Sequence, residues 1–360
     1  MSTSTGPFSF ISNPQHLASA LGVQLDELLT VKALIAAGSA YDYRQKSIHG
    51  KIRALAVPTE RVGSLQRRIT DFLWPLSLEL HPACHGYTSD HSTKTNAAPH
   101  CGALWVQRLD IQDFYPSTDR SKIILALSAV GSNKEIAEAI SDLVTDKNCL
   151  PLGAPSSPLI SNLVLTPLDA ALAGAASSGG LSYTRYADDL TFSSNAAFDM
   201  TEIATLALGE LGFKLNPNKS RLRRRGQSIA VTGLRVSEPD YPRLPKQFKR
   251  RLRQEFYFIQ RFGFAEHCQS RYSWHWIDEE DEERQLEQSR RHLQGKVHYA
   301  LGIERKWATS LLTAYPAAAS ELVPPIGHLV AQRRTALATL STEIKDRPHV
   351  PLSRQLVHVG

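Results

Sequence analysis

The stretch at residues 183–193, YTRYADDLTFS, places two short β-prone runs on either side of two adjacent carboxylates, Asp188 and Asp189. Tyr, Thr and Phe favour extended backbone and Asp tolerates tight turns, so this stretch predicts a β-hairpin with both carboxylates at its tip. Two neighbouring anions repel each other unless a cation lies between them. Oxygen-only ligands suit Mg²⁺ or Mn²⁺. The hairpin alone supplies too few ligands, so a further carboxylate is expected from elsewhere in the chain.

A second β-prone run, LDIQDFYPS at residues 109–117, offers Asp110 as that carboxylate. Taken alone, an Asp-Asp turn is more often a solvated loop than a metal site. The order of four motifs favours the metal site: LDIQDFYPS, LPLGAPSSPLISN at 150–162, YADD, and GFKLNPNKS at 212–220. This order closely resembles the palm of a reverse transcriptase, and the resemblance extends from about residue 40 to about 240.

The resemblance implies an α+β fold of the right-hand polymerase type, with fingers, an antiparallel-sheet palm and a helical thumb. A chain of 360 residues is long enough for two or three folding units. The expected boundaries are 1–90 for the N-terminal helices and fingers, 91–240 for the palm with part of the fingers, 241–320 for the thumb, and 321–360 for a C-terminal tail to which no role is assigned.

The chemistry implied by the resemblance is phosphoryl transfer assisted by two Mg²⁺ ions about 4 Å apart, with Mn²⁺ as the alternative ion. Asp110 and Asp188 are the main expected ligands, Asp189 completes the catalytic cluster, and Ile111 is assigned to the metal site beside Asp110. Asp113 is a competing choice, but the family pattern places the ligand three residues earlier.

Residues 41–58 predict a further β-hairpin with its turn at His49-Gly50. It is similar to the fingers hairpin of retroelement polymerases, which implies that Lys51 and Arg53 contact the triphosphate of the incoming dNTP. Arg can bind phosphate oxygens bidentately and Lys adds a mobile charge. The alternative is that both are ordinary exposed strand residues.

Three further residues match nucleotide-binding positions of the family. Tyr115 matches the aromatic gate that excludes a 2′-hydroxyl, although it could equally be a core aromatic beside Phe114. Gly153 is expected to let the backbone approach the template and nucleotide closely. Leu152 stands where the family usually has Gln, which puts the full set of nucleotide contacts in doubt. Lys219 matches a lysine proposed to protonate pyrophosphate, with a phosphate contact or a simple surface charge as alternatives.

Two short signatures narrow the resemblance to retron reverse transcriptases. The NAxxH signature is present as Asn96, Ala97 and His100, and the VTG signature as Val231, Thr232 and Gly233. Retron enzymes copy a cognate structured non-coding RNA into branched multicopy single-stranded DNA, priming from a guanosine 2′-hydroxyl, and act in anti-phage defence with an effector protein. The expected partners are therefore that RNA, its DNA product, dNTPs and an effector encoded nearby, with which the chain could form an oligomer.

Positive charge is concentrated after the palm motifs. The whole chain carries a net charge of +6, and residues 214–253 contain thirteen Lys or Arg against two acidic residues. Such a segment can bind phosphates by releasing counterions, although a merely solvated basic face has the same composition. Residues 245–259 predict a basic amphipathic thumb helix, in which Lys246, Lys249, Arg250 and Arg253 are expected to contact nucleic acid.

Composition fits a globular protein that does not enter a membrane. No apolar run reaches 18 residues, the first ten residues show no signal-peptide pattern, and the four cysteines form no CxxC pair. A cytoplasmic location is expected. The His and Cys residues at 81–101 raise a zinc site as an alternative, but their spacing lacks two clean ligand pairs.

Two rival functions remain at this point. The first is another bacterial reverse transcriptase, of the group II intron or non-retron defence type. The second is a catalytically weak palm that serves as an RNA-binding scaffold. Residues 16–23 also superficially resemble the start of a helix-turn-helix, although packing of these helices against the fingers is the preferred interpretation.

Overall fold

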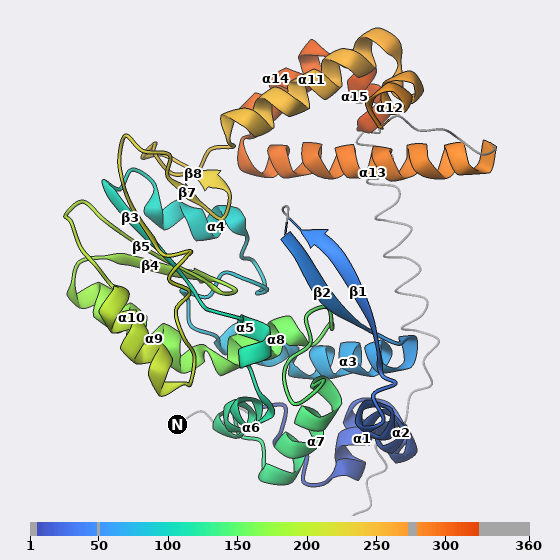
Figure 1. Cartoon of the computed structure of the whole chain (residues 1–360), viewed down its shortest axis with the longest axis vertical. Helices are drawn as coiled ribbons and strands as arrows, with labels where there is room; N and C mark the ends of the chain where they lie inside the picture. The colour runs from blue at the N-terminus through green and yellow to red at the C-terminus, as the bar shows by residue number, and fades with distance from the viewer. Residues whose placement is uncertain (1–5, 49–50, 273–278, 324–360) are drawn as a thin grey trace, which may run out of the picture. The chain divides into compact units, whose positions relative to one another are not determined.

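The computed structural model describes residues 6–48, 51–272 and 279–323, and the chain divides into two compact units, Met1–Arg243 and Leu244–Gly360 (Figure 1). The division lies beside residue 241, where the sequence predicts the thumb to begin. The predicted turn at His49-Gly50 and nearly all of the tail, from residue 324 onward, lie outside the described residues.

A four-stranded antiparallel sheet forms the centre of the first unit. Its strand order is β4-β5-β3-β6, with β4 at Ser182–Tyr186, β5 at Asp189–Ser194, β3 at Trp105–Asp110 and β6 at Arg221–Arg224. Alternate residues of a strand face opposite sides of a sheet. Leu109, Leu190 and Phe192 therefore point into the hydrophobic core, where each is fully buried.

Helices cover the core side of this sheet: α8 at Ser157–Val164, α9 at Thr166–Ser178 and α10 at Thr201–Glu210 (Figure 1). Leu168, Leu172 and Leu208 of α9 and α10 belong to the same hydrophobic cluster as the strand residues. No single helix in the described part of the chain is long and apolar enough to cross a membrane, although α8 and α9, bent by 52° at their junction, pass that test together.

A small layer lies on the opposite side of the sheet. It consists of α4 at Thr93–Ala97, the 3₁₀ helix η2 at Ala98–His100, and the short hairpin of β7 at Ala230–Val231 and β8 at Leu234–Arg235. Ser92 and Thr95 form a reciprocal capping box that fixes the start of α4. Helix α4 contacts β4, β7 and β8, so the layer joins the sheet to this hairpin.

The hairpin predicted at residues 41–58 is confirmed as an antiparallel pair, β1 at Tyr41–Ile48 and β2 at Lys51–Pro58. Its assignment to the fingers stays a prediction. The remaining elements of the unit are α1 (Pro14–Ala20), α2 (Leu25–Ala36), α3 (Glu60–Leu73), η1 (Trp74–Glu79), α5 (Phe114–Ser117), α6 (Arg120–Ala129) and α7 (Lys134–Val144). Of these, α3 contacts β2. Leu17 and Val31 of the first two helices are fully buried, and both helices contact α7. These helices thus pack within the unit, as the sequence predicts.

The second unit is helical in its described part. Its elements are α11 (Lys246–Phe262), α12 (Phe264–Tyr272), α13 (Glu279–Ile303), α14 (Arg305–Ala314) and α15 (Pro316–Leu322). Helix α11 is basic and amphipathic, as predicted, because Leu252, Phe256 and Ile259 are buried along one side. The mixture of helices and antiparallel sheet confirms the coarse expectation of an α+β fold.

Candidate active site

The predicted hairpin at residues 183–193 is formed by β4 and β5. Tyr186 pairs with Asp189, so the turn between the strands contains only Ala187 and Asp188. The sequence places both aspartates at the tip, whereas Asp189 is the first residue of β5. Two-residue hairpin turns need a positive φ, and Ala187 supplies it with φ of +56°. Asp188 thus lies in the turn, and its neighbour Asp189 lies on β5.

The end of β3 brings Asp110 to the same place. Asp110 is the cross-strand partner of Asp189, and the backbone N–H of Ile111 donates to the carbonyl oxygen of Asp188 over 3.0 Å. The Ile111 side chain is buried in the core, so only its backbone is available at the site. Asp110, which is remote in sequence, therefore lies with the adjacent Asp188 and Asp189 at one end of the sheet.

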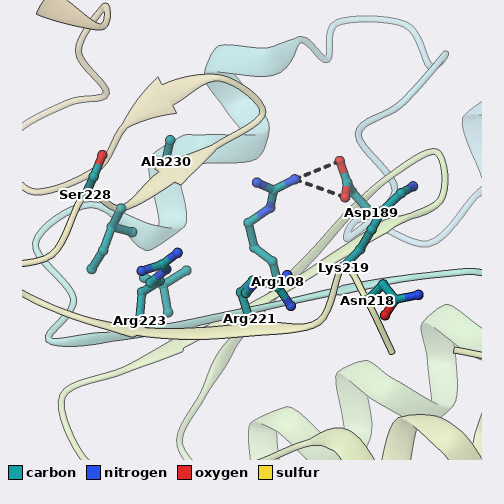
Figure 2. Close-up of a pocket in the computed structure, with 10 residues that line it drawn as sticks. Arg108, Asp189, Asn218, Lys219, Arg221, Arg223, Ser228 and Ala230 are labelled. Carbon is teal, nitrogen blue, oxygen red and sulfur yellow. Dashed lines mark hydrogen bonds and ion pairs between the residues drawn. The ribbon is translucent and has the colours of Figure 1, made fainter. Parts of the chain in front are cut away.

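Two of these carboxylates form ion pairs with basic side chains. Lys219 Nζ lies 2.6 and 2.7 Å from the two carboxylate oxygens of Asp110. Arg108 Nη2 lies 3.0 and 3.1 Å from those of Asp189, as Figure 2 shows. Burial, together with the charges of Asp189 and Asp110, raises the pKa of Asp188 to about 6. The site therefore holds more negative charge than its own cations relieve.

The donor set at this site fits a divalent cation with oxygen ligands, because it consists of carboxylates whose mutual repulsion a cation would reduce. The side chains are not arranged as a finished metal site. In residues 6–48, 51–272 and 279–323, no group of three or more His, Cys, Asp or Glu is close enough together to hold an ion, and this includes the histidines and cysteines at 81–101. A cation bound between Asp110 and Asp188 would have to displace Lys219.

Tyr115 lies close to the turn formed by Ala187 and Asp188. It is half-buried, with its ring 5.3 Å from that of Phe114. Burial raises the pKa of its phenol, and the neighbouring Tyr87 and the charge of Asp188 raise it further. The contact with Phe114 agrees with the core interpretation. The gate role of Tyr115 stays a prediction.

Gly153 makes a close approach within the protein, while its predicted approach to template and nucleotide stays a prediction. Its φ is +124°, and a Cβ at this position would lie 3.0 Å from the carbonyl oxygen of Ala56 on β2. The backbone N–H of Ala56 donates to the carbonyl oxygen of Leu152 over 2.9 Å. The glycine therefore lets the 150–156 loop join the fingers hairpin. Arg53 is exposed on β2, and the residue opposite it in the strand register is Lys46 on β1. For Lys51, only the backbone is described.

The two subfamily signatures meet in a buried joint, which is here defined as Asn96, His100, Thr184, Ser193 and Thr232. Asn96 Nδ2 donates to Thr232 Oγ1 over 3.4 Å, although the two residues are 136 positions apart. His100 contacts the hydroxyls of Ser193 and Thr184 at 2.6 and 2.8 Å. Burial lowers the pKa of His100 to about 3, so its imidazole is neutral.

The remaining signature residues lie in or beside this buried joint. Ala97 and Val231 are fully buried, and Gly233 has φ of +80° in the turn between β7 and β8. The side chains of Asn96 and His100 are also fully buried. Their contacts are therefore with the protein, and the signatures fix the β7-β8 hairpin against the sheet.

Basic residues border the carboxylates on the sheet surface. A pocket of about 370 Å³ beside Asp189 is lined by Val106, Arg108, Asp189, Asn218, Lys219, Arg221, Arg223, Ser228, Ile229 and Ala230 (Figure 2). In the second unit, Lys246, Arg250 and Arg253 are exposed on α11. Lys249 differs from these three because its Nζ lies 2.7 Å from Glu304 Oε1, an ion pair that holds α11 against the start of α14.

Sequence reasoning missed several polar residues around the site. Arg108 could have been identified, because it is two positions before Asp110 and faces the same side of a strand. Arg185 lies within the hairpin stretch but was not assigned a role. Asn162 and Asp169, which contact Arg185, lie on helices whose sequence shows no sign of that contact.

Comparisons with known proteins agree with this geometry. The chain is 36% identical over 233 residues to the Retron Mx65 reverse transcriptase of Myxococcus xanthus, covering 57% of this chain and 54% of that protein. It is 32% identical over 205 residues to the Retron Ec86 reverse transcriptase of Escherichia coli, covering 55% and 62%. The chain thus spans little more than half the length of these curated relatives. They confirm the resemblance to retron reverse transcriptases.

Among solved structures, telomerase from Candida albicans in complex with a TWJ fragment of telomeric RNA is similar with a TM-score of 0.43 and 9% identity, covering 79% of this chain and 60% of that one. The family described as "Reverse transcriptase (RNA-dependent DNA polymerase)" matches residues 43–236, which is more than half of the chain and includes all three carboxylates. The chain therefore belongs to the reverse transcriptase family.

Proposed function

We propose that this chain is an RNA-directed DNA polymerase of the right-hand type, in which the first unit supplies fingers and palm and the second supplies the thumb. One observation carries the proposal: Asp110, Asp188 and Asp189 gather at one end of an antiparallel sheet inside the segment that matches the family. The exposed basic residues of α11 support the thumb assignment, because a duplex would offer them phosphates.

The carboxylates would hold two divalent cations, Mg²⁺ or Mn²⁺, which when bound activate the primer hydroxyl and stabilise the departing pyrophosphate. The protein's own task is positioning and electrostatics. Asp110 and Asp188 supply negative oxygens at fixed positions on the sheet. Lys219, displaced from Asp110, is then available to meet a phosphate oxygen or to protonate pyrophosphate. Tyr115 presents its ring beside Asp188, where it would exclude a 2′-hydroxyl.

The relatives and the buried joint support a retron assignment. The proposed template is a cognate structured non-coding RNA in the cytoplasm, and the proposed product is branched multicopy DNA primed from a guanosine 2′-hydroxyl. An effector protein encoded nearby and a role in anti-phage defence are part of the same proposal. Its support is the similarity to two proteins named as retron reverse transcriptases and the presence of both signatures.

Primer extension on an RNA template tests the polymerase assignment. With Mg²⁺ and dNTPs, the wild-type chain should extend the primer and Asp188→Asn should not, because the asparagine removes a negative ligand. Binding of the RNA by both proteins serves as the control for folding. Equal, background-level products from both would contradict the proposal and favour the RNA-binding scaffold.

Sequencing the nucleic acid that co-purifies with the chain tests the retron assignment separately. One branched DNA species, encoded beside the gene, is expected. Heterogeneous DNA, or none, would leave a polymerase that is not of the retron type.

A further inference from the structure

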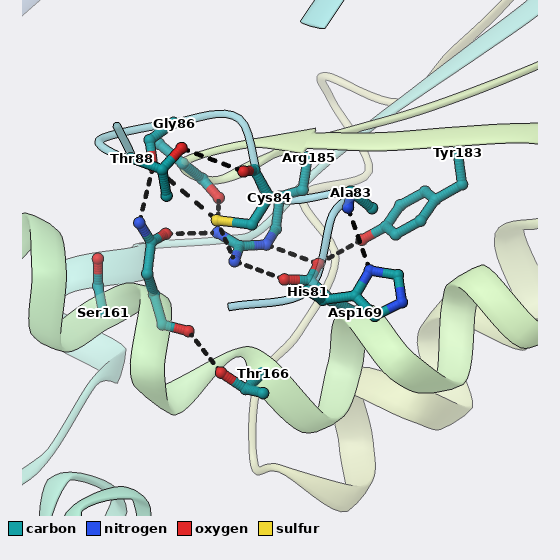
Figure 3. A network of polar contacts seen from close by, with 12 residues as sticks. His81, Ala83, Cys84, Gly86, Thr88, Ser161, Thr166, Asp169, Tyr183 and Arg185 are labelled. Carbon is teal, nitrogen blue, oxygen red and sulfur yellow. Dashed lines mark hydrogen bonds and ion pairs between the residues drawn. The ribbon is translucent and has the colours of Figure 1, made fainter. Parts of the chain in front are cut away.

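A fully buried arginine lies directly beneath the catalytic turn. Arg185, on β4, is 0% exposed, and its partner Asp169, on α9, is 1% exposed. Nε donates to Asp169 Oδ1 over 2.8 Å and Nη2 to Oδ2 over 2.6 Å, which is the bidentate geometry that Arg forms with a carboxylate (Figure 3). The pair anchors the strand that leads into the turn on the helix that covers the core side of the sheet.

The rest of the guanidinium is also fully used. Nη1 donates to Asn162 Oδ1 over 2.9 Å and to the carbonyl oxygen of Ala187 over 3.1 Å, and Nη2 donates to the sulfur of Cys84 over 3.1 Å. All five N–H groups of Arg185 therefore have an acceptor. The contact with Ala187 matters most, because that carbonyl belongs to the peptide bond whose nitrogen is the backbone nitrogen of Asp188.

A glycine also packs closely against the same turn. A Cβ on Gly86 would lie 2.5 Å from the backbone nitrogen of Ala187, so only glycine fits against the turn. Asn162 Nδ2 donates to the carbonyl oxygen of Gly86 over 2.7 Å. Asn162 thus links Arg185 to Gly86. Its side chain accepts a hydrogen bond from Arg185 and donates one to Gly86, which packs on Ala187.

Stability alone gives no reason to bury such a pair. Desolvating two ions costs several kcal/mol each, and apolar residues of similar volume often serve the fold as well. A planar guanidinium bound at five points does something that apolar residues cannot: it fixes the orientation of one peptide bond. Ala187 needs this help, because its φ of +56° is a conformation that a non-glycine residue rarely adopts.

We propose that Arg185, held by Asp169 and Asn162, is the positioning residue for Asp188: it orients the Ala187–Asp188 peptide so that the Asp188 carboxylate points into the metal-binding end of the sheet. The inference rests on the proposed function, because it takes Asp188 to be a metal ligand. Arg185 touches neither substrate nor metal and acts only through the turn.

The test compares two variants of the full chain with a matched control. Arg185→Lys keeps the positive charge but cannot reach Asp169, Asn162 and Ala187 together. Asn162→Ala removes the uncharged link and leaves the ion pair intact. Gln66→Ala is the control, because Gln66 is another fully buried amide, bonded to the Tyr41 hydroxyl and the Leu143 carbonyl oxygen, away from the turn. Each protein is titrated with Mn²⁺ alone and followed by electron paramagnetic resonance, with thermal unfolding and primer extension measured in parallel.

Both turn variants should bind Mn²⁺ about 10- to 100-fold more weakly than wild type, the usual effect of removing a group that orients a metal ligand. Their extension rates should recover in part at high Mn²⁺ concentration. Gln66→Ala should lose thermal stability but keep the wild-type Mn²⁺ affinity. If Arg185→Lys does not fold, Asn162→Ala decides the question. Wild-type Mn²⁺ affinity in the folded turn variants would overturn the positioning role.

Failure of the proposed function has a different signature. If Asp188→Asn itself binds Mn²⁺ as wild type does and extension is absent from every protein, then Asp188 is not a metal ligand and the proposed function fails. If Asp188→Asn loses Mn²⁺ binding and extension while Asn162→Ala keeps both, the function stands and only the positioning role of the buried network is wrong.

Discussion

Replacing Asp188 with asparagine should stabilise the metal-free protein in a pH-dependent way. Burial and the charges of Asp189 and Asp110 raise the pKa of Asp188 in the folded chain from an ordinary 3.8 to about 6. A tenfold change in proton affinity corresponds to about 1.4 kcal/mol. Ionising Asp188 in the folded protein therefore costs up to about 3 kcal/mol relative to ionising it in the unfolded chain. Asparagine does not ionise and avoids this cost.

The sign of the effect follows from where the carboxyl binds its proton. Well below the ordinary pKa of 3.8 the carboxyl is protonated in both the folded and the unfolded chain, so wild type and Asp188→Asn should have similar stability there. Between pH 4 and 6 the unfolded wild-type chain releases the proton first, and wild type loses stability relative to the variant. Above pH 6 the difference should be constant, and for a unit of this size about 3 kcal/mol corresponds to roughly 6–12 °C in thermal midpoint.

The assay is thermal unfolding of both proteins in EDTA from pH 4 to 8, followed by circular dichroism. Asp113→Asn is the matched control, because Asp113 is exposed, follows β3, the strand that carries Asp110, and has φ of +45°, which asparagine tolerates. The control should differ from wild type by a small amount that does not depend on pH. Saturating Mg²⁺ should raise the midpoint of wild type and not that of Asp188→Asn. A difference between wild type and Asp188→Asn that is the same at pH 4 and pH 8 would refute the reasoning.

Three other substitutions probe separate parts of the first unit. Tyr115→Ala should incorporate ribonucleotides at least tenfold more readily relative to dNTPs in primer extension, because a smaller side chain leaves room for the 2′-hydroxyl; unchanged discrimination would leave Tyr115 as a core aromatic only. Lys219→Met should lower the thermal midpoint in EDTA by an amount equivalent to about 1–2 kcal/mol, since it leaves the Asp110 carboxylate without its cation, and saturating Mn²⁺ should restore it. A loss that Mn²⁺ does not repair would count against a shared site. His100→Phe should destabilise the fold by about 2–4 kcal/mol in denaturant titration, because the buried hydroxyls of Ser193 and Thr184 lose their partner, and a change below about 0.5 kcal/mol would contradict the buried joint.

The sequence was sufficient for the elements whose signals are local. The hairpin around Asp188, the β-prone run ending at Asp110, and the basic amphipathic helix α11 are each encoded in one continuous stretch, from 6 residues for β3 to 17 residues for α11. Their side-chain periodicity and turn residues determine the backbone with little help from distant contacts. The family resemblance then predicted that Asp110 joins the two hairpin carboxylates.

Pairings between distant residues were not predictable in the same way. Lys249 shows the usual pattern of an exposed thumb lysine, but Glu304 is 55 positions away and only the packing of the second unit brings them together. Gly153 was assigned to a close approach, and the structure has one, but the partner is Ala56 of the fingers hairpin. The spacing of Arg108 from Asp110 shows that both lie on the same side of the strand, but it does not show the ion pair with Asp189. That pairing depends on strand register, which the whole sheet determines.

The hydrogen bond between Asn96 and Thr232 has a practical consequence for exchanging segments between relatives. Since the helix that carries Asn96 and the turn that carries Thr232 share one interface, each surface is shaped to its counterpart. A chimera that receives only one of these segments from a retron relative would bring together two mismatched halves. Transplanting both segments at once would preserve the fit.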